Sequence, residues 1–260
     1  MQNKTIPMIF NTEMVKALVN GQKTVTRRPL KIPENWSLRD KKLSTITSSH
    51  PKKGKWGALI QNLTDPKFPQ SDIVVAPCNV GDLIYVRETF AALGHDDYKQ
   101  VNPNSTTDIH EFRYKASENE CLANCLDHEV RGYKWVPSIH MPRHASRLTL
   151  KVTDVRIERV QDITPDEAIK EGFNDWTGFA FTWSSIYLDK SLGWDNNPYV
   201  WVIEFEVIHR NVDKCSPEGN EYYCQCDNPK CGNWFTVSKI GTNCQECKEG
   251  SMQPQDIEPY

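Results

Sequence analysis

The 260-residue sequence lacks any long hydrophobic run. A helix that crosses a lipid bilayer needs about 20 consecutive apolar residues, and no stretch of this chain approaches that length. The opening segment MQNKTIPMIF also lacks the continuous apolar stretch of a secretory signal peptide. We therefore expect no membrane partner and a cytoplasmic location.

The chain also has little net charge, −3 at neutral pH, but this charge is unevenly distributed. Residues 1–56 carry twelve Lys and Arg against three Asp and Glu, a local charge of +9. Residues 215–260 carry three against seven, a local charge of −4. The basic segment is suited to facing phosphates, although a lysine-rich loop exposed to water has the same composition.

The cysteines do not have the pattern of an extracellular disulfide framework, because they are nine, an odd number, and six of them fall between Cys215 and Cys247. Four of the six have zinc-ligand spacing, with four residues inside the first pair, twelve between the pairs and two inside the second: Cys226, Cys231, Cys244 and Cys247. Two such pairs can complete a tetrahedral shell around a structural Zn²⁺. Cys224 can replace Cys226, because only one residue separates them. A closed shell of four thiolates has no open position for substrate, so this module is expected to stabilise or bind rather than to catalyse.

Helices are indicated at three places. The first spans residues 11–20, with Asn11 or Thr12 as its N-cap and Gly21 after its end. The second begins at a capping box formed by Thr164 and Glu167, with Pro165 at its first position, Ala168 and Ile169 directed inward, and Gly172 as its stop. The third covers residues 179–188.

Strands are predicted from β-rich or alternating runs bounded by turn residues. One short strand follows the turn GQKT and is ended by Pro29; the others cover 83–88, 147–155 and 199–208. Residues 30–80 and 91–134 lack sustained periodicity and are predicted to be long insertions or irregular loops.

Short strands that are distant in sequence, a few helices and long loops indicate an α+β fold built on a small, partly open β-barrel. The cysteine-rich tail is long enough to fold separately around a metal. We therefore expect two domains, a main domain over residues 1–210 and a zinc ribbon-like module over residues 215–260.

Several uncommon strings occur in an order that resembles the ASCH family, whose fold is similar to that of PUA RNA-binding domains. They are GQKTVTRRP at 21–29, Gly81-Asp82 before Val86-Arg87-Glu88-Thr89, PSIHMPR at 137–143, Ala145-Ser146-Arg147, Trp194-Asp195 and Asn197-Pro198 before Trp201. The resemblance is to the version carried by phages and prophages and covers most of residues 7–208. For a phage-encoded chain, the expected location is the host cytoplasm.

The resemblance implies a cleft on a PUA-like barrel that accepts a nucleobase or nucleotide. One branch of the family hydrolyses N4-acetylcytidine with a lysine and a threonine of the GxKTxT motif and a glutamate near the end of a later helix. By motif, these catalytic residues fall on Lys23, Thr26 and Glu171.

These residue types fit amide hydrolysis, which needs an activated oxygen nucleophile and a proton for the leaving amine. A lysine removed from water loses basicity, so Lys23 can take a proton from Thr26 or from a water molecule, and Glu171 can pass a proton to the leaving nitrogen. Which oxygen attacks stays open. Glu171 also fits an ordinary solvated helix ending. Because Lys23 and Thr26 are an odd number of residues apart, Lys23 must lie in the turn before the strand if both serve one cleft.

Further residues are predicted to contact the base or the nucleic acid. They lie in the turn GQKT and the predicted strand after it, on the predicted strand at 83–88, and in the segment 137–147, whose prolines limit backbone freedom: Thr24, Arg27, Arg28, Arg87, Glu88, Ser138, His140, Arg143 and Arg147. For the arginines the alternative is surface ion pairing, and for Arg87 with Glu88 it is an ion pair in the core.

Three functions follow. The first is an amidohydrolase that acts on an acylated or otherwise modified nucleobase, such as N4-acylated cytidine; the second is a non-catalytic RNA-binding reader, and the third is a ribonuclease. The expected partner is RNA or a modified nucleoside or nucleotide, with DNA possible. The chain is more than twice as long as the minimal hydrolase of the family, so its substrate can be larger than a nucleoside.

Removal of Zn²⁺ is expected to destabilise residues 215–260 and to spare the main domain, because the metal closes only the tail. Limited proteolysis with and without a chelator, with zinc release measured in parallel, tests this. A chelator-induced loss of the main domain's structure would contradict the two-domain division.

Overall fold

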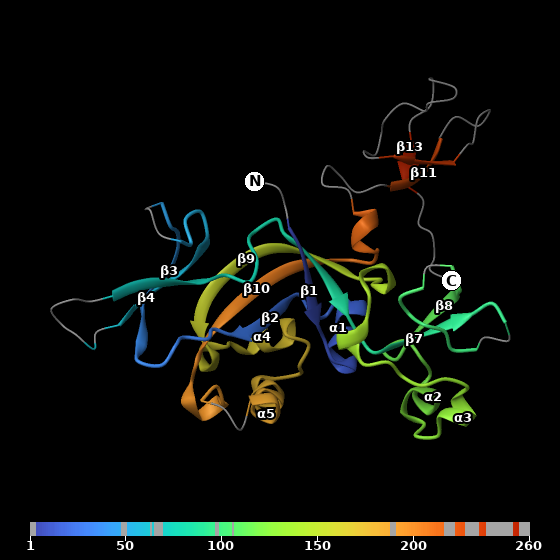
Figure 1. Ribbon diagram of the computed structural model, residues 1–260, viewed down its shortest axis with the longest axis horizontal. Helices are drawn as coiled ribbons and strands as arrows, with labels where there is room; N and C mark the ends of the chain where they lie inside the picture. The colour runs from blue at the N-terminus through green and yellow to red at the C-terminus, as the bar shows by residue number, and fades with distance from the viewer. Residues whose placement is uncertain are drawn as a thin grey trace.

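The structure is a computed structural model that describes residues 4–47, 51–62, 64, 70–96, 99–105, 107–187 and 191–215, and the backbone of 222–226, 234–237 and 252–254. It is an α+β fold in which strands predominate (Figure 1), so the α+β part of the predicted fold is confirmed. No helix in these ranges is long and apolar enough to span a membrane.

The central sheet has five strands in the order β1 (Thr5–Ile9), β6 (Leu83–Arg87), β9 (Thr149–Arg159), β10 (Tyr199–Ile208) and β2 (Val25–Pro29). β1 runs parallel to β6, and the other neighbours are antiparallel. β2, β6, β9 and β10 were predicted as strands, and β10 has the predicted bounds. β9 extends to Arg159, beyond the predicted end at 155, and β1 was not predicted. Apolar side chains on one face, including those of Ile84, Leu150 and Ile203, form the main core.

The order of this sheet is open in the described residues, with β1 and β2 as its edges, but a side chain connects the two edges. Nη2 of Arg28, on β2, donates a hydrogen bond of 2.8 Å to the carbonyl of Ile9 at the end of β1. The Arg28 guanidinium also lies 5.1 Å from the centre of the Phe10 ring. The sheet is therefore curved enough for its two edges to approach each other.

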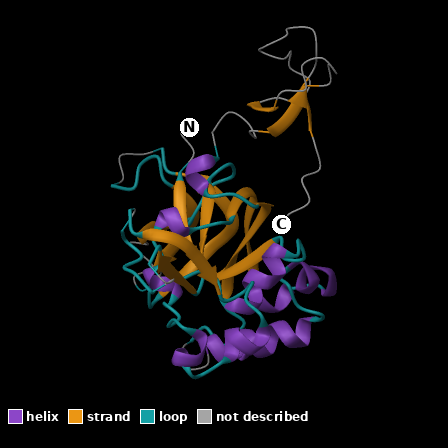
Figure 2. Cartoon of the chain, turned by 90° about the vertical axis from the view of Figure 1, so that its right-hand side faces the viewer, coloured by secondary structure: helices purple, strands orange, loops and turns teal. Residues whose placement is uncertain are grey.

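The helices begin and end largely where their capping residues predicted. α1 (Thr12–Val19) is capped by Asn11, whose side chain accepts from the Met14 amide. α4 (Pro165–Lys170) has the Thr164–Glu167 capping box and is followed by Gly172 at φ +93°. α5 (Trp176–Tyr187) starts three residues earlier than predicted. Figure 2 shows the longer helices gathered along one side of the strands.

One detail of α4 was predicted wrongly. Ala168 is fully buried, but the Ile169 side chain is 47% exposed. Ala168 belongs to the core cluster that contains Val25 and Phe179, and Ile169 lies outside that cluster.

The prediction that residues 30–80 are irregular was wrong for much of that range. It contains a three-stranded antiparallel sheet in the order β3 (Trp36–Thr45), β4 (Trp56–Asn62) and β5 (Gln70–Val75). The pattern was missed because β3 is an edge strand with a register shift between Leu38 and Leu43 and mostly exposed side chains, so it carries little hydrophobic alternation.

Residues 91–134 also contain regular structure. β7 (Phe90–Gly94) pairs with β8 (Ile109–Tyr114), and two short helices follow, α2 (Glu120–Asn124) and α3 (His128–Arg131). The remaining short elements are 3₁₀ helices: η1 (Ser138–His140), η2 (Arg143–Ala145), η3 (Val160–Asp162), η4 (Trp194–Asn196) and η5 (Val212–Lys214).

The C-terminal part has an antiparallel sheet in the order β12 (Trp234–Val237), β11 (Tyr222–Cys226) and β13 (Met252–Pro254). Cys224 and Cys226 lie on β11, where only the backbone is described. Cys231, Cys244 and Cys247 lie outside the described residues. The structural Zn²⁺ therefore stays a prediction.

Gly172, just after α4, packs against Ala17 and the turn that carries Lys23, and replacing it with alanine is expected to destabilise the fold. A Cβ there would lie 2.8 Å from Cβ of Ala17, and φ is +93°. Strain and overpacking together should lower the free energy of unfolding by about 2–3 kcal/mol. Gly21→Ala is the matched control, because φ is +70° there with nothing within 4 Å, and it should lose about 1 kcal/mol. Equal losses in urea denaturation would show that the contact with Ala17 is unimportant.

Candidate active site

Lys23 lies in the turn between α1 and β2, as the spacing of Lys23 and Thr26 predicted. Its backbone amide donates to the Ala17 carbonyl, which continues the end of α1 into the turn. The side chain is fully buried. Its Nζ donates to the Glu171 carbonyl oxygen at 2.8 Å and to Oε2 of Glu171 at 2.5 Å. Lys23 and Glu171, two of the three predicted catalytic residues, are thus in direct contact although 148 positions separate them in the sequence.

Glu171 is the C-cap of α4 and is only 2% exposed. The alternative of a solvated helix ending is therefore wrong. A carboxylate at the end of a helix opposes the helix dipole, so its position is explained by Lys23 and not by helix propensity. Gly172 turns the chain immediately afterwards. A Cβ at this position would lie 3.6 Å from Cβ of Lys23, so the two backbones are close.

Burial changes the basicity of Lys23. Removal from water lowers the pKa of its ammonium below the ordinary value of 10.5; Glu171 opposes this shift, and the neighbouring Arg28 and Arg27 add to it. A lysine of this kind is easier to deprotonate than an exposed one, which is the property that a catalytic base requires.

Thr26 is on β2 and is 2% exposed, next to a buried network of charges. The network begins at Arg27, whose Nη1 lies 3.5 Å from Oε1 of Glu171. Nη2 of Arg27 contacts the carboxylates of Glu158 and Glu167, at 3.1 and 2.9 Å. Arg27 was predicted to contact substrate or to form surface ion pairs, but its side chain is completely buried and holds three carboxylates.

Arg156 extends this network to the middle of the sheet. Its guanidinium contacts four carboxylates: Asp154, Glu158, Glu167 and Glu204. Because Glu158 and Glu167 are shared with Arg27, the position of Glu171 is coupled to β9 and β10 through alternating charges. Neither Arg156 nor Glu167 was among the predicted site residues, since ion pairs across strands leave no pattern along the chain.

A narrow cavity of about 30 Å³ adjoins this centre. Thr26, Arg27, Arg28 and Glu171 contribute its polar wall, and aromatic residues contribute the opposite wall: Phe173, Phe179, Trp183 and Tyr187. The last three recur every four residues along α5, so they share one face of that helix. This spacing was the available sequence signal for the aromatic wall. A volume of 30 Å³ is about that of one water molecule, so the cavity as described is too small for a base.

Three other predicted residues lie around the seam between the sheet edges. The backbone of Thr24 connects the Lys23 turn to Lys170 and Phe205, through hydrogen bonds of 2.8 and 3.0 Å. Arg28 bridges the seam, and Arg87 donates to the Ile139 carbonyl. Within the part of the chain that the structure describes, Nε of Arg28 and Nε of Arg87 are buried without a hydrogen-bond partner.

Glu88 forms its ion pair with Arg147, whereas the predicted core ion pair of Arg87 with Glu88 is not among the described ion pairs. Glu88 is 1% exposed, and Nε and Nη2 of Arg147 donate to its two carboxylate oxygens at 2.9 and 3.0 Å. The guanidinium lies 4.1 Å from the centre of the Tyr114 ring. Burial raises the pKa of Glu88, and Arg147 opposes that shift. These contacts make the pair a core ion pair between β6, β8 and the segment before β9.

The other predicted residues of the 137–147 segment lie at the surface. His140 is exposed at the end of η1, and Ser138, at its start, is half-buried. Arg143 forms an ion pair with Asp213, with Nε 2.7 Å from Oδ1. These side chains have no direct contact with the Lys23–Glu171 pair among the described hydrogen bonds.

A double-mutant cycle tests the coupling of Lys23 to Glu171. Breaking a buried pair leaves one charge uncompensated, so Lys23→Met and Glu171→Gln should each lower the free energy of unfolding by about 3 kcal/mol. The double variant should lose at least about 1 kcal/mol less than the sum of the single losses. The exposed pair Lys16–Glu13, with Nζ 3.1 Å from Oε1, provides the control cycle and should couple by no more than about 0.5 kcal/mol. Equal coupling in the two cycles would contradict the buried ion pair.

Comparison of the chain with models of known protein families, with curated proteins and with solved structures finds no match. Its function is therefore inferred from the chemistry of the site.

Proposed function

We propose that the chain binds a modified nucleobase at the centre formed by Lys23, Thr26 and Glu171, and that it hydrolyses the acyl group of an N4-acylated cytidine. The contact between the buried Lys23 ammonium and the Glu171 carboxylate carries this proposal. A buried ion pair is not an efficient way to stabilise a fold, because desolvation offsets its attraction. A titratable pair with a shifted pKa beside a hydroxyl is typical of catalytic sites.

In the proposed reaction, neutral Lys23 accepts a proton from water or from the Thr26 hydroxyl. The deprotonated oxygen adds to the acyl carbon, and the bond from that carbon to N4 breaks when N4 receives a proton through Glu171. Direct attack by water releases the carboxylic acid and cytidine. Attack by Thr26 forms an ester that water then cleaves, with the same products.

Access to this centre requires an outward movement of α5, because the cavity is smaller than a base. The aromatic face of α5 can then stack on the base, as aromatic side chains do with unpaired bases in RNA. Arg28, between the sheet edges, lies on the polar wall of the same cavity, where it can stabilise the negative charge of the tetrahedral intermediate.

The fold proposal follows the same resemblance. We regard the five-stranded sheet, with its edges connected by Arg28, as the partly open barrel of a PUA-like ASCH domain. Residues 215–260 are proposed as an appended zinc ribbon held by Cys226, Cys231, Cys244 and Cys247. The proposed partner is RNA or a modified nucleoside in the cytoplasm.

A non-catalytic reader is the second candidate, and the closed cavity favours it. In the described conformation Lys23 already uses Glu171 as acceptor, and there is room for about one water molecule beside Thr26. A protein that only recognises a base needs no more than these paired groups and the aromatic wall.

Hydrolysis distinguishes the two candidates. The chain is incubated with N4-acetylcytidine and with RNA that contains it, and released acetate is measured. Wild type should release acetate, and Lys23→Met should be at least about 100-fold slower. Lys16→Met, on the exposed side of α1, is the matched control and should retain full activity.

Because the neutral amine is the active base, kcat/KM should rise with pH through the lowered pKa of Lys23 and level off above it. RNA binding by wild type without acetate release would refute the enzyme and support the reader. Cleavage of labelled RNA in the same incubation, with or without a divalent metal, would instead indicate the ribonuclease.

A further inference from the structure

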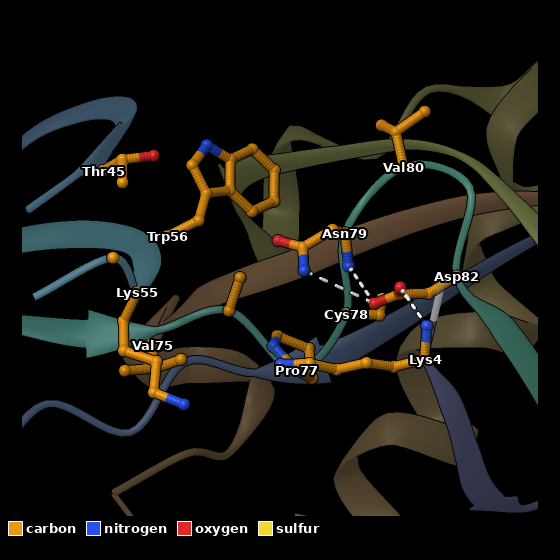
Figure 3. Close-up of a pocket in the computed structure, with 12 residues that line it drawn as sticks. Lys4, Thr45, Lys55, Trp56, Val75, Pro77, Cys78, Asn79, Val80 and Asp82 are labelled. Atoms are coloured by element: carbon orange, nitrogen blue, oxygen red, sulfur yellow. Dashed lines mark hydrogen bonds between the residues drawn. The ribbon is translucent and has the colours of Figure 1, made fainter. Parts of the chain in front are cut away.

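A second cavity, of about 380 Å³, lies where the sheet β3–β4–β5 meets the start of β1 and the loop before β6. This volume falls in the range of about 300–1,000 Å³ that small-molecule sites occupy. Figure 3 shows the Trp56 indole on one side of the cavity and the side chains of Lys4 and Lys55 on the other. None of these residues belongs to the Lys23 centre.

Trp56 provides an aromatic surface at the beginning of β4. Its side chain is half-buried, packs against the main core and also lines the cavity. An indole held in this way is already fixed, so stacking a ligand on its flat face costs little further side-chain entropy. Stacking of a base on an aromatic side chain contributes about 1–3 kcal/mol.

Two cations at the rim have no ion-pair partner in the residues that the structure describes. Lys4 and Lys55 are both exposed, and no salt bridge joins either to a described carboxylate. Lys52, on the same turn as Lys55, differs, because its Nζ contacts Asp72 at 2.8 Å. Unpaired ammonium groups at the mouth of a cavity attract an anionic ligand.

The one carboxylate of the cavity is already engaged. Oδ1 of Asp82 accepts the Lys4 amide at 2.8 Å, and Oδ2 accepts the Asn79 backbone amide at 2.8 Å and the Asn79 side-chain nitrogen at 3.4 Å. The cavity therefore keeps a net formal charge of +1 from Lys4, Lys55 and Asp82. Asn79 presents its amide beneath the indole (Figure 3), where it can pair with the edge of a base.

Cys78 closes the floor of the cavity and does not supply reactive sulfur. Burial, with a smaller effect of Asp82, raises the pKa of its thiol to about 12. A protonated thiol is neither a good nucleophile nor a metal ligand. The lining is thus that of a binding site and not that of a second catalytic centre.

We propose that this cavity binds a nucleotide, with its base stacked on Trp56 and its phosphate held between Lys4 and Lys55. Each part of the ligand has a matching group in the cavity. The indole would stack on the base, and the two ammonium groups would bind the phosphate. The site is separate from the proposed hydrolytic centre and does not depend on it. It gives the inserted strands β3–β5 a function in binding a nucleotide, either free or at the end of a strand.

Calorimetric titration of the full chain with adenosine 5′-monophosphate, adenosine and inorganic phosphate tests the proposal. The monophosphate should bind at least about tenfold more tightly than either fragment, because stacking and charge act together. Trp56→Leu should weaken its binding at least about fivefold, and Trp56→Phe should retain most of it. Lys55→Gln should weaken it about fivefold, whereas the exposed Lys53→Gln, which does not line the cavity, is the matched control and should bind as wild type does.

The same titration on Lys23→Met separates the two sites, since nucleotide binding should be unchanged there. A 5′-phosphorylated oligonucleotide that binds more tightly than the monophosphate would identify the end of a strand as the natural source of the nucleotide. Binding that is unaffected by both Trp56→Leu and Lys55→Gln, or no measurable binding of the monophosphate to folded wild type, would overturn the proposal.

Discussion

The ammonium group of Lys23 has no access to water, and two oxygens of Glu171 accept its hydrogen bonds. A buried charge needs such partners, because leaving it uncompensated costs several kcal/mol, about 3–5. The requirement connects the turn after α1 to the end of α4, segments that are 148 residues apart in the chain. Gly172 makes the approach possible, since a side chain there would meet Ala17. Much of the local architecture follows from this one contact.

The surrounding arginines extend the same constraint across the sheet. Arg27 neutralises part of the Glu171 charge and shares Glu158 and Glu167 with Arg156. Such a chain of alternating charges holds the carboxylate of Glu171 in one orientation, which is what a proton-transfer group requires. Arg28 has a different role, because it connects the two sheet edges and at the same time lines the cavity beside Thr26. The candidate site therefore lies at the seam of the curved sheet.

The two cavities have opposite physical characters. The cavity beside Thr26 is narrow and is lined by the aromatic face of α5 and by Arg27 and Glu171, which pair with each other. The cavity beside Trp56 is wide, and its rim carries lysines that have no described ion-pair partner. A small site next to a lysine with a lowered pKa suits proton transfer, and a larger cationic site suits reversible binding of a phosphate. The inserted strands β3–β5 thus extend the main sheet with a surface of their own.

The sequence alone determined the features that arise from local chemistry. Asn11, Thr164 and Gly172 set helix ends through contacts within a few residues, and alternation marked β9 and the second half of β10 as strands. The first half of β10 is buried on both faces. It also placed Lys23 in the turn before β2. Through the resemblance it predicted Lys23, Thr26 and Glu171 as one site, and the contact between Lys23 and Glu171 is present. The cysteine spacing that predicts a zinc module is a property of the sequence, and it falls mostly outside the described residues.

Only the tertiary structure decided which charges are buried and which residues they face. For Arg27 and Glu171 the sequence left surface exposure open as an alternative, and each is buried beside a counter-charge that another segment supplies. Arg147 was predicted to contact substrate, but it pairs with Glu88. β3 forms from a run with little alternation because β4 provides its hydrogen bonds. Ion pairs and strand pairings between distant segments depend on distances in space, and these have no periodicity along the chain.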